Sequence, residues 1–246
     1  MDNRSDARNV KNKMLEFVRA NSGIEQKRDY LGMSQIGRCP RMLYRWIVEG
    51  KGDASDAAHL NCISGYMLED KMLWILAGAG LLGSKAWATL PKDDANREIV
   101  APFDNRFRGH IDGEMFDGTL LEVKTFNADD YNRVTRTNQL PKPYIWQVQA
   151  YMRYGDYDET LMVLVCRDPF TFWTMTLKCD DRIGAAIDER ARMILSALDD
   201  GRIPVCACGR CDSVPGASSF NRSNPHPAAK QTTRSDYAHP TWRTRV

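Results

Sequence analysis

The sequence predicts an α/β (α+β) fold in which a central mixed β-sheet is flanked by helices. Apolar residues recur at helical spacing in the first third of the chain and alternate at strand spacing in the middle. A helix, an apolar strand pair and a further amphipathic helix then follow. This order of elements is typical of a single mixed sheet with helices packed on it.

Three helices are predicted in the N-terminal third. Met14, Phe17 and Val18 stand at helical spacing in the first. Ser34 precedes the second helix and Gly50 follows it, as start and stop signals. The third repeats apolar residues every three or four positions and ends in a glycine-rich stretch. The predicted ranges are 11–20, 35–49 and 56–77.

The middle of the chain predicts strands, because apolar residues alternate there between turn residues such as Asp117-Gly118. Pro141 and Pro143 separate a polar helix from the next one. An apolar strand pair surrounds Asp168-Pro169, and an amphipathic helix follows. The predicted strands are 98–101, 107–115, 119–125, 160–166 and 171–177, and the helices are 128–137, 144–154 and 180–198.

Composition indicates an ordinary globular protein, with 246 residues, 43% hydrophobic and 27% charged. A net charge of +2 is too small to indicate nucleic-acid binding by itself. The chain has no apolar run of about 18 residues and no apolar core near its N-terminus. We therefore expect a cytoplasmic protein without a membrane partner. Residues 1–212 are predicted to form one domain, and the Ser-, Pro- and Arg-bearing residues 213–246 a disordered basic tail.

The hairpin predicted at residues 109–125 carries the most chemistry. A two-residue loop at Asp117-Gly118 would mix polar and apolar side chains on both faces. A three-residue loop, residues 116–118 with Gly118 left-handed, pairs Met115 with Thr119 and sorts the two kinds. That register places Asp112 opposite Glu122 and His110 opposite Lys124. The opposite face then holds Ile111, Met115, Leu121 and Val123.

Two acidic residues facing each other across strands have Cβ atoms about 5 Å apart, and their carboxylates repel unless a cation neutralises them. Mg²⁺ or Mn²⁺ suits carboxylate oxygens. Lys124 falls on the same face as Glu122, where its ammonium could position an attacking water or stabilise charge on a phosphate. The alternative is a solvated hairpin face, but the phasing of Asp112 with Glu122 and Lys124 favours a site.

These residues bear a family resemblance. Asp112, nine intervening residues and Glu122-Val123-Lys124 resemble the PD-(D/E)XK nuclease signature. The sequence Gly-His-Ile-Asp-Gly at 109–113 is similar to the Gly-x-Ile-Asp strand of the RecB-type exonuclease branch. Gln147 and Tyr151 are similar to its Gln-x-x-x-Tyr helix and share a helix face. The resemblance implies a restriction-endonuclease-like core in which these two residues shape the site.

Residues 65–69 resemble the first motif of that family. The resemblance implies that Glu69, Asp112, Glu122 and the Val123 carbonyl bind the metal, while Lys124 assists the water. Many RecB-type members have histidine where this chain has Glu69, so this chain departs toward an all-carboxylate site. A solvated helix residue is the alternative interpretation of Glu69. His59 has no family role and is interpreted as a surface or core histidine.

Seven cysteines without an export signal argue against a disulfide framework. Cys206, Cys208 and Cys211 crowd into six residues, which suggests a metal site. The resemblance to iron–sulfur members, such as the CRISPR-associated exonucleases and the AddB subunit, implies a 4Fe–4S cluster with Cys39 as the fourth ligand. The cysteines are spaced more tightly than in those members, so Zn²⁺ with Cys39 or His226 is the alternative. Cys62, Cys166 and Cys179 are expected in the core.

Basic and aromatic residues near the predicted site could follow a DNA backbone and stack bases. Taken one at a time, each is typical of a solvated helix face. The predicted DNA contacts are Arg38, Arg41, Tyr44, Arg45, Arg133, Arg136, Lys142 and Arg153.

The residues and the resemblance together predict a Mg²⁺-dependent DNA exonuclease that hydrolyses phosphodiester bonds of linear or single-stranded DNA. Recombination, repair or replication is the implied setting, in a phage or mobile element and with proteins of those processes as candidate partners. One alternative is a structure- or site-specific endonuclease with the same core. Another is a non-catalytic DNA-binding or partner subunit with a structural metal cluster.

Overall fold

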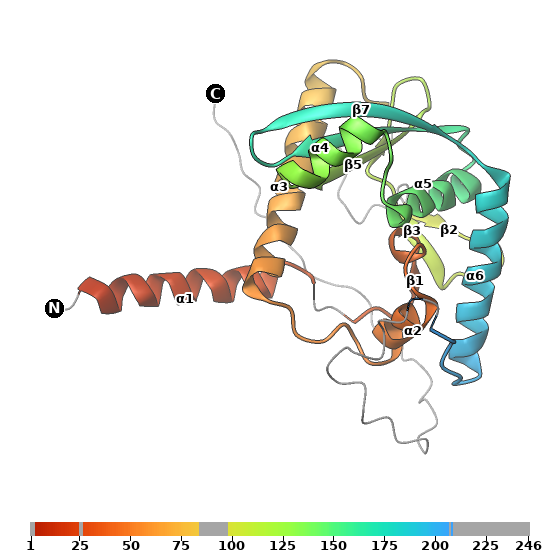
Figure 1. Cartoon of the computed structure of the whole chain (residues 1–246), viewed down its shortest axis with the longest axis horizontal. Coiled ribbons are helices and arrows are strands. Elements are labelled where there is room, and N and C mark those ends of the chain that lie inside the picture. The colour runs from red at the N-terminus through yellow and green to blue at the C-terminus, as the bar shows by residue number, and fades with distance from the viewer. Residues whose placement is uncertain (1–2, 25–26, 84–97, 207, 209–246) are drawn as a thin grey trace.

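The computed structural model describes residues 3–24, 27–83, 98–206 and 208. The mixed α+β fold is confirmed, with helices flanking strands that divide into two mixed sheets rather than one (Figure 1). The predicted tail, residues 213–246, lies outside the described residues.

The smaller sheet has the strand order β1-β3-β2, formed by Leu31–Gly32, Phe107–His110 and Glu98–Val100. In it β1 runs parallel to β3, and β2 runs antiparallel to β3. The larger sheet has the order β4-β5-β6-β7. Its strands are Gly113–Glu114, Leu120–Phe126, Glu159–Cys166 and Thr171–Lys178. Only β5 and β6 are parallel there.

A parallel pair needs a crossover, which the helices α4 (Ala128–Thr137) and α5 (Lys142–Gly155) supply between β5 and β6. Asn127 caps α4 by accepting a hydrogen bond from the Asp130 amide at 2.8 Å. On the other side of the sheet, α3 (Asp56–Gly78) packs against β5. The helix α6 (Asp181–Asp199) packs against α5 and α2 (Pro40–Val48).

Alternation along β5 divides the interior into two cores. Leu120 and Phe126 pack into the larger core with α4 and α5. Leu121 and Val123 pack into a smaller core with Met72 and other residues of α3. Glu122 and Lys124 therefore point toward the α4–α5 side, which decides which helix can reach them.

The predicted strand 107–115 is wrong as a single strand. Ile111 is 1% exposed and lies in the larger core, not beside Leu121 and Val123 in the smaller one. The backbone therefore leaves the smaller sheet after β3 and enters the larger sheet at β4. His110 accordingly pairs with Glu98 of β2, not with Lys124 as the continuous hairpin predicted.

The predicted helix 35–49 is also too long. A short 3₁₀ turn, η1 (Met33–Gln35), precedes Gly37, and α2 begins only at Pro40. A Cβ atom on Gly37 would lie 2.6 Å from the Pro143 Cα. The turn after η1 therefore approaches α5 so closely that only glycine fits at this position. Pro40 then starts α2, because its fixed φ suits the first helical position.

The N-terminal helix α1 (Asn3–Asn21) projects from the body of the molecule (Figure 1). Arg19 pairs with Asp56 of α3 at 2.6 Å, and the Ser22 hydroxyl is hydrogen-bonded to Nδ1 of His59 at 2.6 Å. His59 is thus a core histidine that anchors the end of α1. In the described part of the chain, no helix is long and apolar enough to cross a bilayer.

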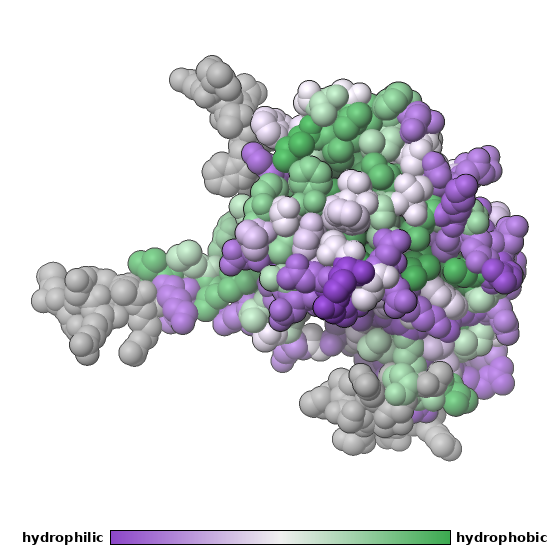
Figure 2. Space-filling model, turned by 45° about the horizontal axis from the view of Figure 1, so that its top comes forward, coloured by the Kyte–Doolittle hydropathy of each residue, from purple (hydrophilic) through white to green (hydrophobic). Residues whose placement is uncertain are grey.

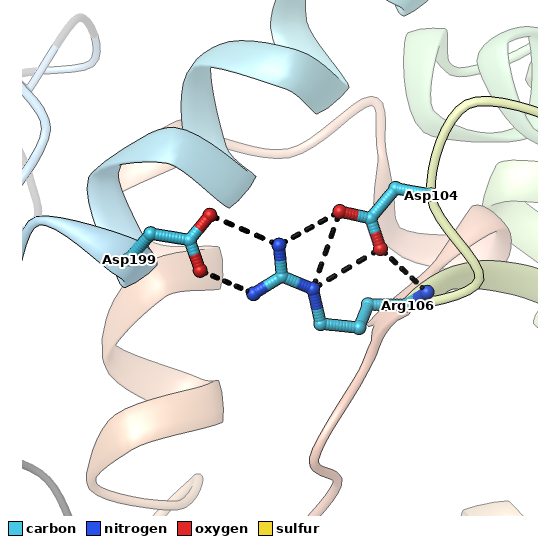
Figure 3. A network of polar contacts seen from close by, with 3 residues as sticks. All are labelled: Asp104, Arg106 and Asp199. Carbon is cyan, nitrogen blue, oxygen red and sulfur yellow. Dashed lines mark hydrogen bonds and ion pairs between the residues drawn. The ribbon is translucent and has the colours of Figure 1, made fainter.

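Two features of the surface are an arginine that links two aspartates and a set of exposed apolar residues. Arg106 bridges Asp104, in the loop before β3, and Asp199, at the end of α6, with nitrogen–oxygen distances of 2.7 and 2.6 Å (Figure 3). Figure 2 shows apolar residues gathered in the upper part of one face, with hydrophilic residues across its middle. The edge strand β7 exposes Phe172 and Trp173 to about half their area.

Candidate active site

The β4–β5 hairpin adopts the predicted three-residue loop. Gly113 pairs with Leu121 and Glu114 with Leu120. The Met115 amide donates to the Thr119 carbonyl at 2.8 Å, and Gly118 has a φ of +88°. Continuing this register sets Asp112 opposite Glu122. The Asp112 carboxylate accepts a hydrogen bond from the Val123 amide at 2.8 Å, which fixes it beside β5.

Glu122 is the buried centre of the site, with 0% of its surface exposed. Its Oε1 accepts a hydrogen bond from Nε2 of Gln147 at 2.6 Å and a second from the Lys124 ammonium. Its Oε2 is also buried but has no hydrogen-bond partner among the described residues. Buried carboxylate oxygens normally have hydrogen-bond partners. The lack of one at Oε2 is therefore consistent with a ligand-binding position.

The electrostatics of Glu122 also favour a cation. Burial raises the pKa of Glu122 to about 8, and the nearby charges of Asp112 and Glu69 add to the rise against the opposing effect of Lys124. Burial by itself lowers the pKa of Lys124, but the carboxylates of Glu122, Asp112 and Glu69 outweigh it and hold the amine protonated. A divalent ion would stabilise the ionised carboxylates in the same way.

Helix α5 closes the site from the other side. Nε2 of Gln147 lies 3.4 Å from the Tyr151 hydroxyl, and both side chains are buried. Burial raises the pKa of Tyr151 well above its usual value, and the charges of Glu122 and Asp112 raise it further. Gly109 makes room for this tyrosine, since a Cβ there would lie 2.7 Å from its Cε1.

The structure therefore brings Asp112, Glu122, Lys124, Gln147 and Tyr151 together. Glu69, half-buried on α3, is near enough for its charge to shift the pKa of both Glu122 and Lys124. Carboxylate oxygens around an unpaired Glu122 Oε2 form a donor set that suits Mg²⁺ or Mn²⁺. The oxygens of Glu69, Asp112 and Glu122 do not all lie within 4.8 Å of one another in the described structure.

The sulfur atoms of Cys39, Cys206 and Cys208 do lie within 4.8 Å of one another. The Cys206 sulfur is 3.9 Å from that of Cys39 and 3.4 Å from that of Cys208. The third thiol of the predicted cluster, Cys211, and the alternative ligand His226 lie outside the described residues. The arrangement joins the start of α2 to the chain segment that follows α6.

The remaining cysteines only partly follow the prediction of core positions. Cys166 is buried, and Cys62 is half-buried and donates to the Ser22 carbonyl at 3.3 Å. Cys179 is exposed, so its predicted core position is wrong. It follows the last residue of the edge strand β7, where no element of the described structure covers the side chain.

The predicted DNA contacts differ in their surroundings. Tyr44 is 2% exposed in the core, so the prediction that it stacks on a base is wrong. Four arginines contact protein groups instead of standing apart: Arg45 with Glu49, Arg133 with Asp130, Arg153 with Asp188, and Arg41 with the Pro204 carbonyl. Arg38 lies over the Trp46 ring, and Lys142 over the Trp146 ring.

The structure also contains a cation-rich cavity that was not predicted from the sequence. Arg28, Tyr30, Gln35, Trp46 and Lys51 contribute to its lining. The Lys51 ammonium lies 5.3 Å from the Trp46 ring centroid. Burial lowers the pKa of Lys51, and the charges of Arg28 and Arg38 lower it further.

The charge of Arg28, which lines this cavity, also lowers the pKa of Tyr151 against the larger effect of burial. Oε1 of Gln35 is buried there without a hydrogen-bond partner among the described residues. The residues come from separate stretches of the chain, so no local motif marks them. A short basic stretch at Lys27-Arg28, before the strand β1, is the signal that could have indicated them.

Comparison with known proteins places this geometry in context. Residues 87–158 match the YqaJ-like viral recombinase domain, and they include Asp112, Glu122, Lys124, Gln147 and Tyr151. Glu69 and the three clustered thiols lie outside that match. No curated protein matches the chain.

Two crystal structures of LHK-Exo, an alkaline exonuclease from Laribacter hongkongensis, are similar to the protein. The complex with dAMP shares 18% sequence identity, with a TM-score of 0.54 over 70% of this chain and 89% of that chain. The second structure gives 17% identity and the same TM-score and coverage. The protein therefore has the mixed α+β fold of the PD-(D/E)XK-like exonucleases, and its acidic site lies in the segment similar to the YqaJ-like viral recombinase domain.

Proposed function

We propose that this protein is a metal-dependent DNA exonuclease that hydrolyses phosphodiester bonds of linear DNA in recombination. The observation that carries the proposal is the buried Glu122, held at one oxygen by Gln147 and Lys124 and unpartnered at the other. The match to a viral recombinase domain over this site and the fold shared with an alkaline exonuclease support it. A phage or mobile element, with recombination or replication proteins as partners, is the proposed setting.

The proposed mechanism assigns a task to each side chain. Asp112 and Glu122, with Glu69 and the Val123 carbonyl, would hold Mg²⁺, which supplies activation of water and neutralises charge on the phosphate. Gln147 fixes Oε1 of Glu122, so that Oε2 stays directed into the site. Lys124, kept protonated by its acidic neighbours, orients the attacking water and stabilises negative charge on the phosphate.

The cation-rich cavity supports DNA as the substrate. Burial lowers the pKa of Lys51, and the charges of Arg28 and Arg38 lower it further; a phosphate group would relieve this repulsion. Tyr30 and Trp46 add aromatic surface to the same cavity. Contacts of this kind with the DNA backbone would make binding depend strongly on salt.

The decisive experiment uses linear single-stranded and duplex DNA labelled at the 5′ or 3′ end, with Mg²⁺. We expect stepwise release of nucleotides from an end, no activity in EDTA, and a loss of at least about 100-fold in Lys124→Ala, as for the removal of one stabilising group in other enzymes. Lys178→Ala, at the far end of the edge strand β7, is the matched control and should retain activity.

Two results would contradict this proposal. Full Mg²⁺-dependent activity in Lys124→Ala would remove the assigned mechanism. Cutting of covalently closed circular DNA would replace the exonuclease by the endonuclease alternative, because a closed circle has no ends.

The clustered thiols are proposed to hold a structural metal centre, a 4Fe–4S cluster with Zn²⁺ as the alternative. The three sulfur atoms within 4.8 Å of one another support it, and Cys211 would be the fourth ligand. Visible absorption and metal analysis of anaerobically purified protein distinguish the two metals. A colourless protein with bound zinc would exclude iron, and a protein with neither metal would exclude the site.

A further inference from the structure

The Tyr144 ring, which the proposed mechanism does not use, contacts the ammonium group of Lys124. Along α5, Tyr144, Gln147 and Tyr151 are spaced by three and four residues and therefore share one helix face. Gln147 and Tyr151 form a hydrogen-bonded network with Glu122. Tyr144 stands one turn earlier, next to Lys124.

The contact is between a cation and an aromatic face. Nζ of Lys124 lies 5.6 Å from the centroid of the Tyr144 ring. The ring is itself fixed by Phe126 of β5, with centroids 5.7 Å apart and planes at 87°. Phe126 points to the same side of β5 as Glu122 and Lys124, so a single strand face positions both the amine and the ring that contacts it.

We propose that Tyr144 is a positioning residue that holds the Lys124 ammonium in place for the reaction. The inference rests on the proposed nuclease function and assigns a residue that the sequence motifs do not include. The Tyr144 ring acts through Lys124, because the ring's contact at the site is with the amine.

The physical reason lies in what a lysine side chain can do. Lys124 has a flexible stem, and its side chain is 19% exposed, so the amine can turn toward solvent. On the carboxylate side, Oε1 of Glu122 accepts a hydrogen bond from the amine. The electron-rich ring face attracts the ammonium from a second direction without adding a charge or a proton acceptor. The amine is therefore held between Glu122 and Tyr144.

The first test compares side chains at position 144 in the nuclease assay. Tyr144→Phe keeps the ring and should retain kcat within about two-fold. Tyr144→Leu removes the ring's electrons and should lower kcat by about 3- to 30-fold, the range expected for losing a cation–π contact. KM for DNA should change far less, because the ring is assigned no contact with the substrate.

A graded probe separates this role from simple packing. Phenylalanine analogues with one, two or three ring fluorines, incorporated at position 144, keep the ring's shape while withdrawing its electrons. The inference expects kcat to fall stepwise with each fluorine. The same kcat for all the analogues would overturn it, and so would full activity in Tyr144→Leu.

Two controls keep the outcomes distinct. Tyr154→Leu alters the same helix away from the site, in contact with Phe103 and Phe107, and should lower the melting temperature without lowering kcat. In a Lys124→Ala background, Tyr144→Leu should cause no further loss under single-turnover conditions, and an additional loss would overturn the inference. An inactive wild-type protein would instead refute the proposed function itself.

Discussion

Glu122 shows how a single residue is made both costly and useful. A carboxylate with no exposed surface loses its hydration, and burial accordingly raises its pKa to about 8. Gln147 and Lys124 offset part of this cost at one oxygen only. The other oxygen has no partner among the described residues, and the proposed Mg²⁺ would offset the remaining cost there.

Arg106 contributes to the stability of the fold through two ion pairs. Its hydrogen bonds lower the pKa of both Asp104 and Asp199, and all three side chains are partly exposed (Figure 3). A carboxyl whose folded pKa lies below its unfolded value stabilises the fold above about pH 4, and this stabilisation is lost as the pH falls through the folded pKa.

We therefore expect Arg106→Met to lower the free energy of unfolding by about 1 kcal/mol at pH 7, since solvent screens the network. The difference from wild type should shrink steadily below about pH 4. Urea unfolding measured between pH 7 and pH 3 checks this. Arg202→Met, which breaks a more exposed pair with Asp200, is the control and should leave stability nearly unchanged. A pH-independent difference would contradict the electrostatic explanation.

At the scale of elements, the site depends on how closely β3 approaches α5. Gly109 of β3 faces Tyr151 of α5, and an added Cβ would lie 2.7 Å from the tyrosine Cε1, 3.0 Å from the Met33 Cβ and 3.1 Å from the tyrosine hydroxyl. Gln147 contacts that same hydroxyl and also Glu122. The distance between β3 and α5 therefore affects the orientation of Glu122 through Tyr151 and Gln147.

Gly109→Ala should destabilise the protein by about 1–3 kcal/mol through overpacking and should lower nuclease activity as well, because it displaces Tyr151. Chemical denaturation and the labelled-DNA assay measure the two effects. Gly78→Ala is the matched control. It lies at the end of α3, where an added Cβ meets no atom within 4 Å, so it should leave both quantities unchanged or raise stability slightly. Wild-type activity in Gly109→Ala would show that the tyrosine position is unimportant.

At the scale of the whole molecule, the thiol set joins distant parts of the chain. Cys39 and Cys206 are 167 positions apart, and their sulfur atoms lie 3.9 Å apart. A metal centre at this point would close most of the described chain into one loop. Cross-links that close long loops stabilise a fold mainly by restricting the unfolded chain.

Cys39→Ser should therefore lower the melting temperature by about 5–10 °C, as expected from the loss of a few kcal/mol in a chain of this size. Treatment of the wild type with a chelator should cause a similar shift. Cys179→Ser changes an exposed thiol outside the set and should melt like wild type. Equal melting temperatures for Cys39→Ser and wild type would contradict a structural metal centre.

The hairpin register and the charged residues of the site could be predicted from the amino-acid sequence alone. The two-residue period of a strand and the left-handed preference of Gly118 leave one loop that separates polar from apolar side chains, and the structure has that loop. The same period placed Glu122 and Lys124 on one face. These features are local, so a short stretch of sequence is enough to specify them.

The point at which the chain leaves one sheet for another, and the surroundings of the site, depend on packing between distant segments and could not be predicted in this way. Ile111 could have joined either core on periodicity alone, and packing places it in the larger one, which turns the chain and pairs His110 with Glu98. For the same reason Tyr44, predicted at the DNA-binding surface, is buried, and Cys179, predicted in the core, is exposed. Burial and the meeting of separate segments, as in the cation-rich cavity, depend on contacts between distant residues, which a local pattern does not encode.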